Sequence, residues 1–361
     1  MKKNTPKRVL VAMSGGVDSS VAVALLQRAG FDVFGVFMRF WKAPNEKKGG
    51  WNRCCSIDSE KRARAVAQKL GISFYTLNFS SEFKKRVVDY FLKEYKQGRT
   101  PNPCVVCNKE IKFGLLLEKA LAFKADFIAT GHYANTKCTK AGCKLFQSKN
   151  KDKDQSYFLW QLNQKQLKKI LFPVGDYTKA QVREIAEEFG LPTAQTKESQ
   201  EVCFIETTTA DFLKKYLKQK PGPIREITSN GVHKIIGEHQ GLWFYTIGQR
   251  KGIGLSGGPY YVLEKNIKTN TLIVTKNETE IEEKELLAKN VNWISGKSPK
   301  LPIKVKMKIR HSLELSSGQV IGEIKPGLYK VVFTKPQTAV ASGQSVVFYN
   351  KNELLGGGII C

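Results

Sequence analysis

The feature that most constrains this chain is a glycine turn set between an expected strand and an expected helix near the start. An apolar run over Arg8–Ala12 precedes it, and helical periodicity follows over Ser19–Ala29. The segment reads Ala12, Met13, Ser14, Gly15, Gly16, Val17, Asp18, Ser19, Ser20. Glycines let backbone N–H groups approach an anion, and the helix N-terminus adds partial positive charge. Since the G-x-x-x-x-G-K-[ST] lysine is missing, we expect a pyrophosphate-binding loop of another kind, in which Asp18 holds Mg²⁺ or caps the helix.

The first part of the chain alternates between strand-like and helix-like patterns. Further strands are expected over Val33–Met38, Ser73–Leu77 and Phe127–Thr130. Further helices are expected over Lys61–Leu70, Lys109–Ala122 and Thr178–Phe189. Such alternation predicts a parallel sheet covered by helices, an α/β fold.

The pattern changes at Pro221-Gly222-Pro223, beyond which short alternating segments predict antiparallel strands in barrels or small sheets. The expected strands are Leu242–Ile247, Tyr260–Glu264, Thr271–Val274, Ile303–Ile309, Tyr329–Phe333 and Ser345–Tyr349. A charged segment, Glu278–Leu287, divides this β part in two. The cluster Gly252–Gly257 fits G-x-G-x-x-G, but Pro259 and a strand follow it rather than a helix, so we interpret it as a turn.

Charge favours a polyanionic partner. Lys and Arg number 59 against 32 acidic residues, a formal charge of +27 spread along the whole chain. A diffuse positive field attracts nucleic acid and speeds its arrival. No apolar run reaches the ~18 residues of a membrane helix, and Met1–Lys7 lacks the features of a signal peptide, so we expect a cytoplasmic protein.

Eight cysteines stand in a chain with no export signal, so we expect no structural disulfides. Cys107 follows a Pro-rigid loop and lies near the start of an expected helix, which favours a reactive thiolate. Cys203 lies after a helix and a turn, where a buried packing role is the alternative.

Cys138 and Cys143 bracket an expected hairpin, and a zinc site combining them with Cys104 and Cys107 is disfavoured by the unequal spacing. The adjacent Cys54 and Cys55 are poorly placed to share a metal, and Cys361 is incidental. Only four histidines and no H-E-x-x-H are present, so a catalytic zinc site has little support.

Several strings in order along the chain carry a specific resemblance. They are Met13–Ser20, Thr100–Gly114, Ala129–Tyr133, Lys153–Leu159, Glu198–Ile205, Tyr245–Gly252, Arg310-His311 and Ser342–Gln344. With them the chain resembles the bacterial tRNA-specific 2-thiouridylases, a branch of the PP-loop N-type ATP pyrophosphatase superfamily. The resemblance implies a PP-loop α/β domain over 1–217, a small central β domain over 218–282 and a C-terminal β-barrel over 283–361.

The resemblance also implies an activity. ATP adenylates the C2 oxygen of the wobble uridine of tRNA, and a cysteine persulfide then supplies sulfur, releasing AMP and pyrophosphate. Mg²⁺ is implied as a cofactor. The implied partners are tRNA and a persulfide carrier protein or desulfurase, with the enzyme itself a monomer.

Site residues follow from the same match. Cys107 holds the position of the nucleophile, and Cys203 that of the persulfide carrier. The implied ATP contacts are Ala12, Met13, Ser14, Gly15, Gly16, Val17, Asp18, Ser19, Met38 and Gly131. The implied RNA contacts are Asn102, Pro103, Cys104, His132, Lys153, Asp154, Gln155, Arg310, His311 and Gln344.

Cys104 departs from the family pattern, because many members carry Asp there. A thiol does not replace a carboxylate at neutral pH unless it is strongly acidified. Cys104 is then a packing residue, or it joins Cys107 and Cys203 in holding a [4Fe–4S] cluster. We favour a redox pair of Cys107 and Cys203, since persulfide transfer needs only two thiols. The rival functions are a PP-loop amidating ligase and a noncatalytic RNA-binding protein.

Overall fold

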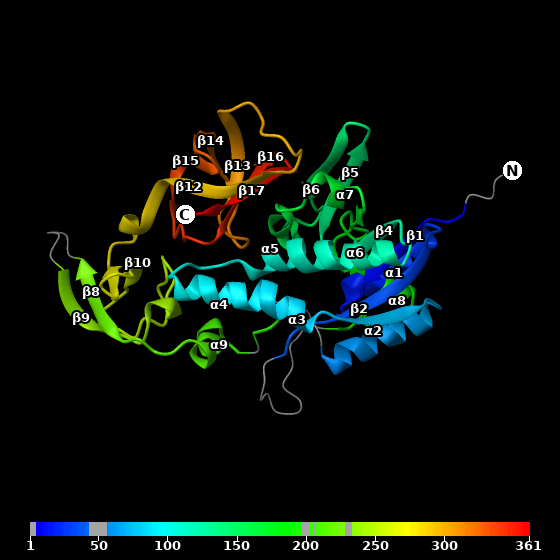
Figure 1. The fold of residues 1–361 in the computed structure, drawn as a ribbon, viewed down its shortest axis with the longest axis horizontal. Helices are drawn as coiled ribbons and strands as arrows, with labels where there is room; N and C mark the ends of the chain where they lie inside the picture. The colour runs from blue at the N-terminus through cyan, green and yellow to red at the C-terminus, as the bar shows by residue number, and fades with distance from the viewer. Residues whose placement is uncertain (1–4, 43–55, 197–201, 206, 228–232) are drawn as a thin grey trace.

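The computed structural model describes residues 5–42, 56–196, 202–205, 207–227 and 233–361, and the strands in these ranges form three sheets. Figure 1 shows the N-terminal sheet at one end of the molecule, a small sheet at the other end, and a barrel beside the helices that lie between them.

The N-terminal sheet is parallel, in the order β3-β2-β1-β4-β7. Its strands are β1 Arg8–Ala12, β2 Asp32–Arg39, β3 Phe74–Asn78, β4 Phe127–Thr130 and β7 Ile170–Leu171. Val9, Leu10 and Val11 are fully buried because helices cover both faces, which explains the continuous apolar runs. The predicted α/β fold is confirmed.

One face of this sheet packs against α1 Val17–Arg28, α2 Ile57–Lys69 and α8 Lys179–Glu188. The other face packs against helices from the segment between β3 and β4. These are α3 Ser80–Phe83, η1 Lys84–Val88, α4 Asp89–Lys96, α5 Pro103–Cys107, η2 Asn108–Leu115 and α6 Leu116–Ala122.

The helix expected from Lys109 begins six residues earlier, at Pro103. The run α5–η2–α6 is continuous, with Asn102 as its N-cap accepting from Val105 N at 3.4 Å. Proline is well suited to the first helical position, because its missing N–H would have no partner there. Cys104 and Cys107 therefore lie within the first turns of this helix.

The small central sheet has the order β10-β11-β8-β9. Its strands are β8 Gly222–Ile227, β9 His233–His239, β10 Tyr261–Asn266 and β11 Thr271–Thr275. The strand predicted over Leu242–Ile247 is wrong, since Leu242–Phe244 forms the 3-10 turn η5. Leu242 and Tyr245 both enter the central core, a spacing of three that fits a helical turn. The glycine cluster lies in a loop, with positive φ at Gly252, Gly254 and Gly257, as expected of a turn.

The C-terminal strands form a closed antiparallel barrel, because the first strand also pairs with the last. They are β12 Glu282–Trp293, β13 Ile303–Lys308, β14 Ser316–Lys325, β15 Leu328–Thr338, β16 Ser345–Asn350 and β17 Glu353–Ile360. Fully buried Val331, Val346 and Phe348 fill the barrel. The expected β architecture of this part is confirmed.

A hairpin from the N-terminal half extends the barrel sheet. It consists of β5 Ala134–Thr139 and β6 Gly142–Gln147, and β6 pairs with β17 through Leu145–Leu354 and Phe146–Glu353. Trp160 strengthens the junction by donating its indole N–H to Ser345 Oγ at 3.0 Å. The smaller elements are η3 Lys151–Lys153, η4 Ser156–Leu159, α7 Gln164–Leu167, α9 Thr209–Tyr216 and η6 Glu278–Ile281.

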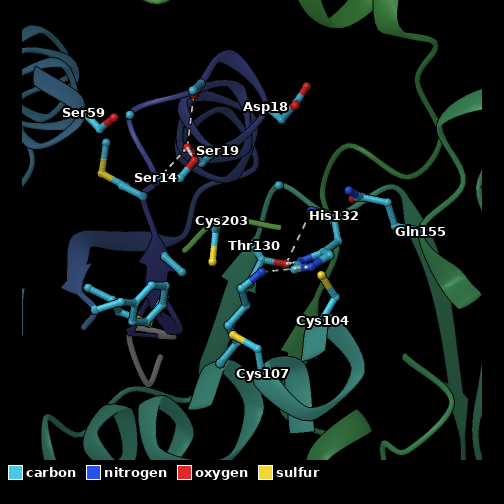
Figure 2. A pocket seen from close by; sticks show the side chains of 18 of the residues that line it. Ser14, Asp18, Ser19, Ser59, Cys104, Cys107, Thr130, His132, Gln155 and Cys203 are labelled. Atoms are coloured by element: carbon cyan, nitrogen blue, oxygen red, sulfur yellow. Dashed lines mark hydrogen bonds between the residues drawn. The ribbon is translucent and has the colours of Figure 1, made fainter. Parts of the chain in front are cut away.

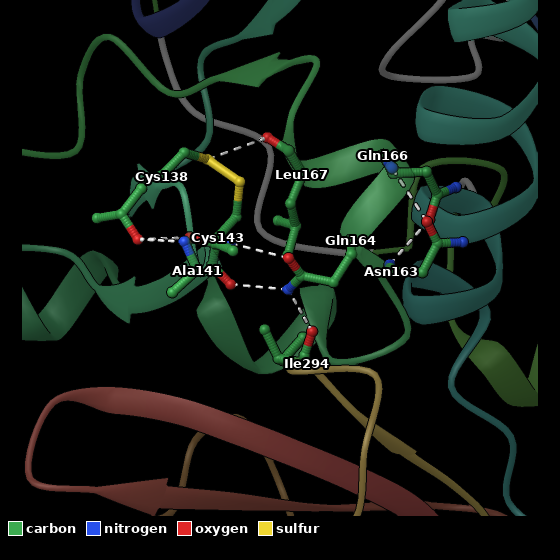
Figure 3. Close-up of a disulfide and its surroundings, with 10 residues drawn as sticks. Cys138, Ala141, Cys143, Asn163, Gln164, Gln166, Leu167 and Ile294 are labelled. Atoms are coloured by element: carbon green, nitrogen blue, oxygen red, sulfur yellow. Dashed lines mark hydrogen bonds between the residues drawn. A yellow bond between two sulfur atoms is a disulfide. The ribbon is translucent and has the colours of Figure 1, made fainter.

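The same hairpin carries a disulfide between Cys138 and Cys143 (Figure 3). The two residues are directly opposed across β5 and β6, with Cα atoms 4.0 Å apart, so the register brings the thiols together. The expectation that no structural disulfide forms is therefore wrong. The zinc alternative is also wrong, because sulfurs bonded to each other are not thiolate ligands.

No helix in the described ranges combines the length and the apolar character that crossing a bilayer requires.

Candidate functional site

A cavity of about 360 Å³ lies beside the ends of β1, β2 and β4 from which the chain leaves the sheet. It is lined by the loop residues Ala12–Ser19, by Met38 and Gly131, and by residues of α5, including Cys104 and Cys107. Cys203 joins them from a distant part of the chain (Figure 2). The ends of parallel strands are the usual binding edge of an α/β sheet.

The glycine loop has the conformation that an anion site requires. Gly15 has φ of +74°, and a Cβ there would lie 2.1 Å from Ser59 O, so only glycine fits. Ser19 Oγ accepts from Ser14 N at 3.1 Å and donates to Gly16 O at 3.1 Å. Arg62 Nε donates to Gly15 O at 3.0 Å and braces the turn from α2.

Asp18 is held by an ion pair beside the loop. Its Oδ1 accepts from Lys179 Nζ and from Tyr133 OH, each at 2.7 Å. The alternative that Asp18 caps helix α1 is wrong, because Gly16 is the N-cap and Asp18 lies in the first turn. The other role proposed for Asp18, binding Mg²⁺, uses a single carboxylate. Mg²⁺ is commonly bound through one or two carboxylates together with substrate phosphates, so the residue suits that role.

Gly131 packs directly against the loop. A Cβ there would lie 2.6 Å from Ser19 N and 2.7 Å from the carbonyl carbon of Asp18. The end of β4 thus sets how closely the loop and the start of α1 approach the cavity.

The three cavity thiols come from two segments. Cys104 and Cys107 are on α5, and Cys203 lies between that helix and the glycine loop in Figure 2. Cys107 is buried, whereas Cys104 and Cys203 are half-buried. Cys107 and Cys203 are not joined in a disulfide in this structure.

His132 is a buried neutral base in the cavity wall. Burial, aided by the positive charge of Lys112, lowers its pKa well below the usual 6.5. Lys112 Nζ lies 3.5 Å from His132 Nε2, and Thr130 Oγ1 lies 2.7 Å from Nδ1. An ammonium only donates, so Nε2 accepts and the ring proton is on Nδ1.

Of the three residues Lys153–Gln155, two line the cavity and the third is buried away from it. Lys153 and Gln155 line the cavity, and Gln155 Oε1 accepts from Tyr133 N at 3.0 Å. Asp154 is buried at 2% exposure, and its carboxylate accepts from Gln147, Ser148 and Ser156. Its carboxylate therefore orders the chain around it rather than facing the cavity.

Arg310, His311 and Gln344 do not line the cavity, although Pro103 does. His311 Nε2 lies 2.9 Å from Asp154 O, and its ring stacks on Phe158 with centroids 4.6 Å apart. Arg310 and Gln344 contact backbone carbonyls of other parts of the chain.

Sequence reasoning missed Arg62, Lys112 and Lys179 in the cavity wall. One signal was available for Lys179, because the Thr178 capping box fixes a helix start and a cation there opposes the helix dipole. The partners of Arg62 and Lys112 depend on tertiary packing alone. Cys54, Cys55 and Glu198–Glu201 lie outside the described residues.

Three family models match consecutive parts of the chain. They are described as a tRNA methyl transferase HUP domain over 7–207, a tRNA methyl transferase PRC-barrel domain over 210–276 and an aminomethyltransferase beta-barrel domain over 283–360. A relative from Clostridium botulinum, "tRNA-specific 2-thiouridylase MnmA", is 46% identical over 363 residues, covering 99% of this chain and 98% of its own. A relative of the same name from Clostridium perfringens is 44% identical, covering 99% of each chain.

Solved structures align less closely. NMN synthetase from Francisella tularensis aligns with 58% of this chain and 72% of its own, at 15% identity and a TM-score of 0.35. A predicted subunit of tRNA methyltransferase from Methanocaldococcus jannaschii covers 50% of this chain and 76% of its own, at 17% identity and a TM-score of 0.30.

Proposed function

The chain belongs to the tRNA-specific 2-thiouridylase family, and from that premise we propose that the cavity beside the glycine loop is where it thiolates a tRNA uridine. The observation that carries the proposal is a single cavity that combines the glycine loop with Cys107 and Cys203. ATP, the uridine and the sulfur-carrying thiol must meet for the reaction. The cavity has the glycine loop for ATP, Lys153 for the RNA, and Cys107 and Cys203 for the sulfur.

The first step is activation of the uridine C2 oxygen by ATP. Oxygen is a poor leaving group at a carbonyl carbon, and transfer of AMP to it makes departure possible. The inward-turned loop around Gly15 and Gly16, together with Lys179, supplies positive field for the pyrophosphate that forms. Mg²⁺, held by Asp18, would neutralise phosphate charge there.

The second step transfers sulfur. The terminal sulfur of a Cys203 persulfide attacks C2, the C2–O bond breaks and AMP leaves. The Cys107 thiolate then attacks the inner sulfur of Cys203, and the S–S bond of the persulfide breaks to leave thiouridine and a Cys107–Cys203 disulfide. In the alternative order Cys107 first releases hydrosulfide, which attacks C2, and the same disulfide results. A thiol reductant must open this disulfide before another turnover.

We propose that the reaction does not use the [4Fe–4S] cluster considered for Cys104, Cys107 and Cys203. Among the described residues no group of three or more Cys, His, Asp or Glu is arranged to hold a metal ion, although Cys104, Cys107 and Cys203 line one cavity. We assign Cys104 no cluster, and no step of the reaction passes through one.

The partners in this proposal are tRNA and a persulfide carrier or desulfurase. The net charge of +27 attracts the negatively charged RNA. Lys153 lines the cavity, where its ammonium group can bind a phosphate or a base of the tRNA. We further propose that the wobble uridine is the target and that the protein acts as a cytoplasmic monomer.

A second candidate comes from the description of two family models, which names methyl transfer to tRNA. Methyl transfer needs neither an anion-binding loop nor two thiols at one cavity. The residues of the cavity therefore favour thiolation.

The test is a set of Cys→Ser variants assayed with tRNA, ATP, Mg²⁺ and a desulfurase with L-cysteine. Nucleoside analysis measures 2-thiouridine, and AMP is measured separately. We expect Cys107→Ser and Cys203→Ser to abolish 2-thiouridine, and Cys104→Ser to retain it without iron.

Cys361→Ser is the matched control, because Cys361 is exposed at the C-terminus. Methylated instead of thiolated nucleoside from the wild type would refute the function. Loss of product in all three cavity variants, with a wild type active only when iron is present, would restore the cluster.

A further inference from the structure

Hydrogen bonds from the C-terminal barrel hold the segment just before α5. Thr100 N donates to Ser342 O at 2.8 Å, and Gln344 Nε2 donates to Thr100 O at 3.0 Å and to Pro101 O at 3.2 Å. A Cβ at Gly343 would lie 3.0 Å from Thr100 N, so the two backbones touch. These contacts join positions more than 240 residues apart in sequence.

The central β domain holds the same segment from another side. Thr246 Oγ1 lies 3.3 Å from Thr100 Oγ1. Arg310 Nη2 donates to Ile247 O at 3.2 Å and to Ala339 O at 3.0 Å, which ties the turn after Thr246 to the barrel. Thr100 therefore lies where all three parts of the molecule meet.

This junction is coupled to the reacting thiol by a short stretch of chain. Pro101 is buried, Asn102 caps α5, and Pro103 is the first residue of the helix. Two prolines in three residues restrict the backbone, so a shift of Thr100 is transmitted to the helix start. Cys107 is one turn further along the same helix.

The side-chain amide of Gln344 donates both of its hydrogen bonds to backbone carbonyls of this chain. Carbonyl acceptors require the amide nitrogen, so the two contacts fix the orientation of the amide. Both of its hydrogens point at Thr100 O and Pro101 O. No donor on Gln344 is left for an RNA base in this structure.

We infer that Gln344, with Thr246, is a positioning residue that sets the placement of Cys107 through the Thr100–Asn102 segment. Through these contacts the barrel and the central domain control the placement of the thiol that acts in the sulfur step. This inference rests on the proposed function. It differs from the RNA contact expected for Gln344 from sequence resemblance.

The variants are Gln344→Leu, which removes both donors at similar volume, and Thr246→Val, which removes one hydroxyl from the other domain. Single-turnover formation of 2-thiouridine is followed as a function of tRNA concentration in the full-length protein. For both variants we expect a fall of about tenfold or more in the saturated rate, because displacing a reacting group by ~1 Å costs up to ~100-fold. The tRNA concentration at half saturation should change by less than about twofold, since uniform binding is untouched.

Gln337→Leu is the matched control. Gln337 also donates its amide nitrogen to two backbone carbonyls, those of Lys335 and Pro336, but within its own strand of the barrel. It should leave both parameters unchanged. An increase in half-saturating tRNA with an unchanged saturated rate would identify Gln344 as an RNA contact and overturn the inference.

A substrate-free measurement separates this inference from the proposed function. Alkylation of Cys107 by iodoacetamide, resolved by peptide mass spectrometry across pH, should show an altered profile in both variants. An unchanged profile overturns the positioning role even if the wild type makes no 2-thiouridine. If Gln344→Leu fails to fold, Thr246→Val decides alone, and wild-type rate and profile in that variant refute the inference.

Discussion

Gly131→Ala is expected to disable the ATP step by displacing the glycine loop. The added Cβ would lie 2.6 Å from Ser19 N, whereas real Cβ contacts essentially never fall under 3.0 Å and ordinary ones begin at 3.4 Å, so β4 and the loop must separate by several tenths of an ångström. The two nearest atoms are backbone and the third is the Cβ of Asp18, so no change of rotamer can move them away. No positive φ is involved, so the effect is steric alone.

The magnitude follows from this displacement. Overpacking of this kind costs roughly 1–3 kcal/mol of stability, and a misplacement near 1 Å costs up to ~100-fold in rate. We expect tRNA-dependent AMP formation to fall by about 10- to 100-fold while circular dichroism stays native. AMP is measured by chromatography at saturating ATP, so that weaker binding of ATP is overcome.

Gly322→Ala is the control, because a Cβ there meets no heavy atom within 4 Å. It should leave AMP formation unchanged. If Gly131→Ala retains AMP formation to within about twofold, equivalent to roughly 0.4 kcal/mol, the reasoning from loop displacement is refuted.

Three further outcomes are expected. Lys179→Met, which removes the cation on Asp18, should lower AMP formation by about tenfold or more, and wild-type activity in this variant would exclude Lys179 from the site. The folded-state pKa of His132 is lowered, so the stability it contributes is complete above pH ~6.5 and is lost as pH falls below that value, by up to about 1.4 kcal/mol per unit. Urea unfolding of wild type and His132→Gln between pH 5 and pH 7.5 checks this, and equal pH slopes would contradict it. Serine at both Cys138 and Cys143 should lower stability by at most about 2 kcal/mol, the value for closing so short a loop, and leave thiolation intact; loss of thiolation with the fold retained would tie the disulfide to the reaction.

Local features of the site could be predicted from sequence, whereas its assembly could not. The turn at Gly15 and Gly16 follows from strand, glycine and helix signals within a few residues. The placement of Cys107 and Cys203 in one cavity matches the roles that the family resemblance implies for them, but no pattern within either segment gives it.

Errors arose where distant packing decides the outcome. The apolar residues of Leu242–Ile247 suggested a strand, but the need to bury Leu242 and Tyr245 on one side produced a turn. Gln344 is polar and near an expected functional string, and nothing local shows that its amide is committed to Thr100 and Pro101. Burial of Asp154 among three donors is equally invisible, because those donors are placed by the hairpin and loop around it.

The pairing of β6 with β17 has a consequence for synthesis. Leu145 pairs with Leu354, which is synthesised 209 residues later, so this pairing cannot form until the last strand has been made. At about 5–20 residues per second, roughly 10–40 s pass on the ribosome before that partner is made. During this interval β6 is paired only with β5. The backbone N–H and C=O groups on its other edge are unpaired, and another nascent chain can pair with them. Completion of the final strand therefore ends a period of aggregation risk as well as closing the barrel.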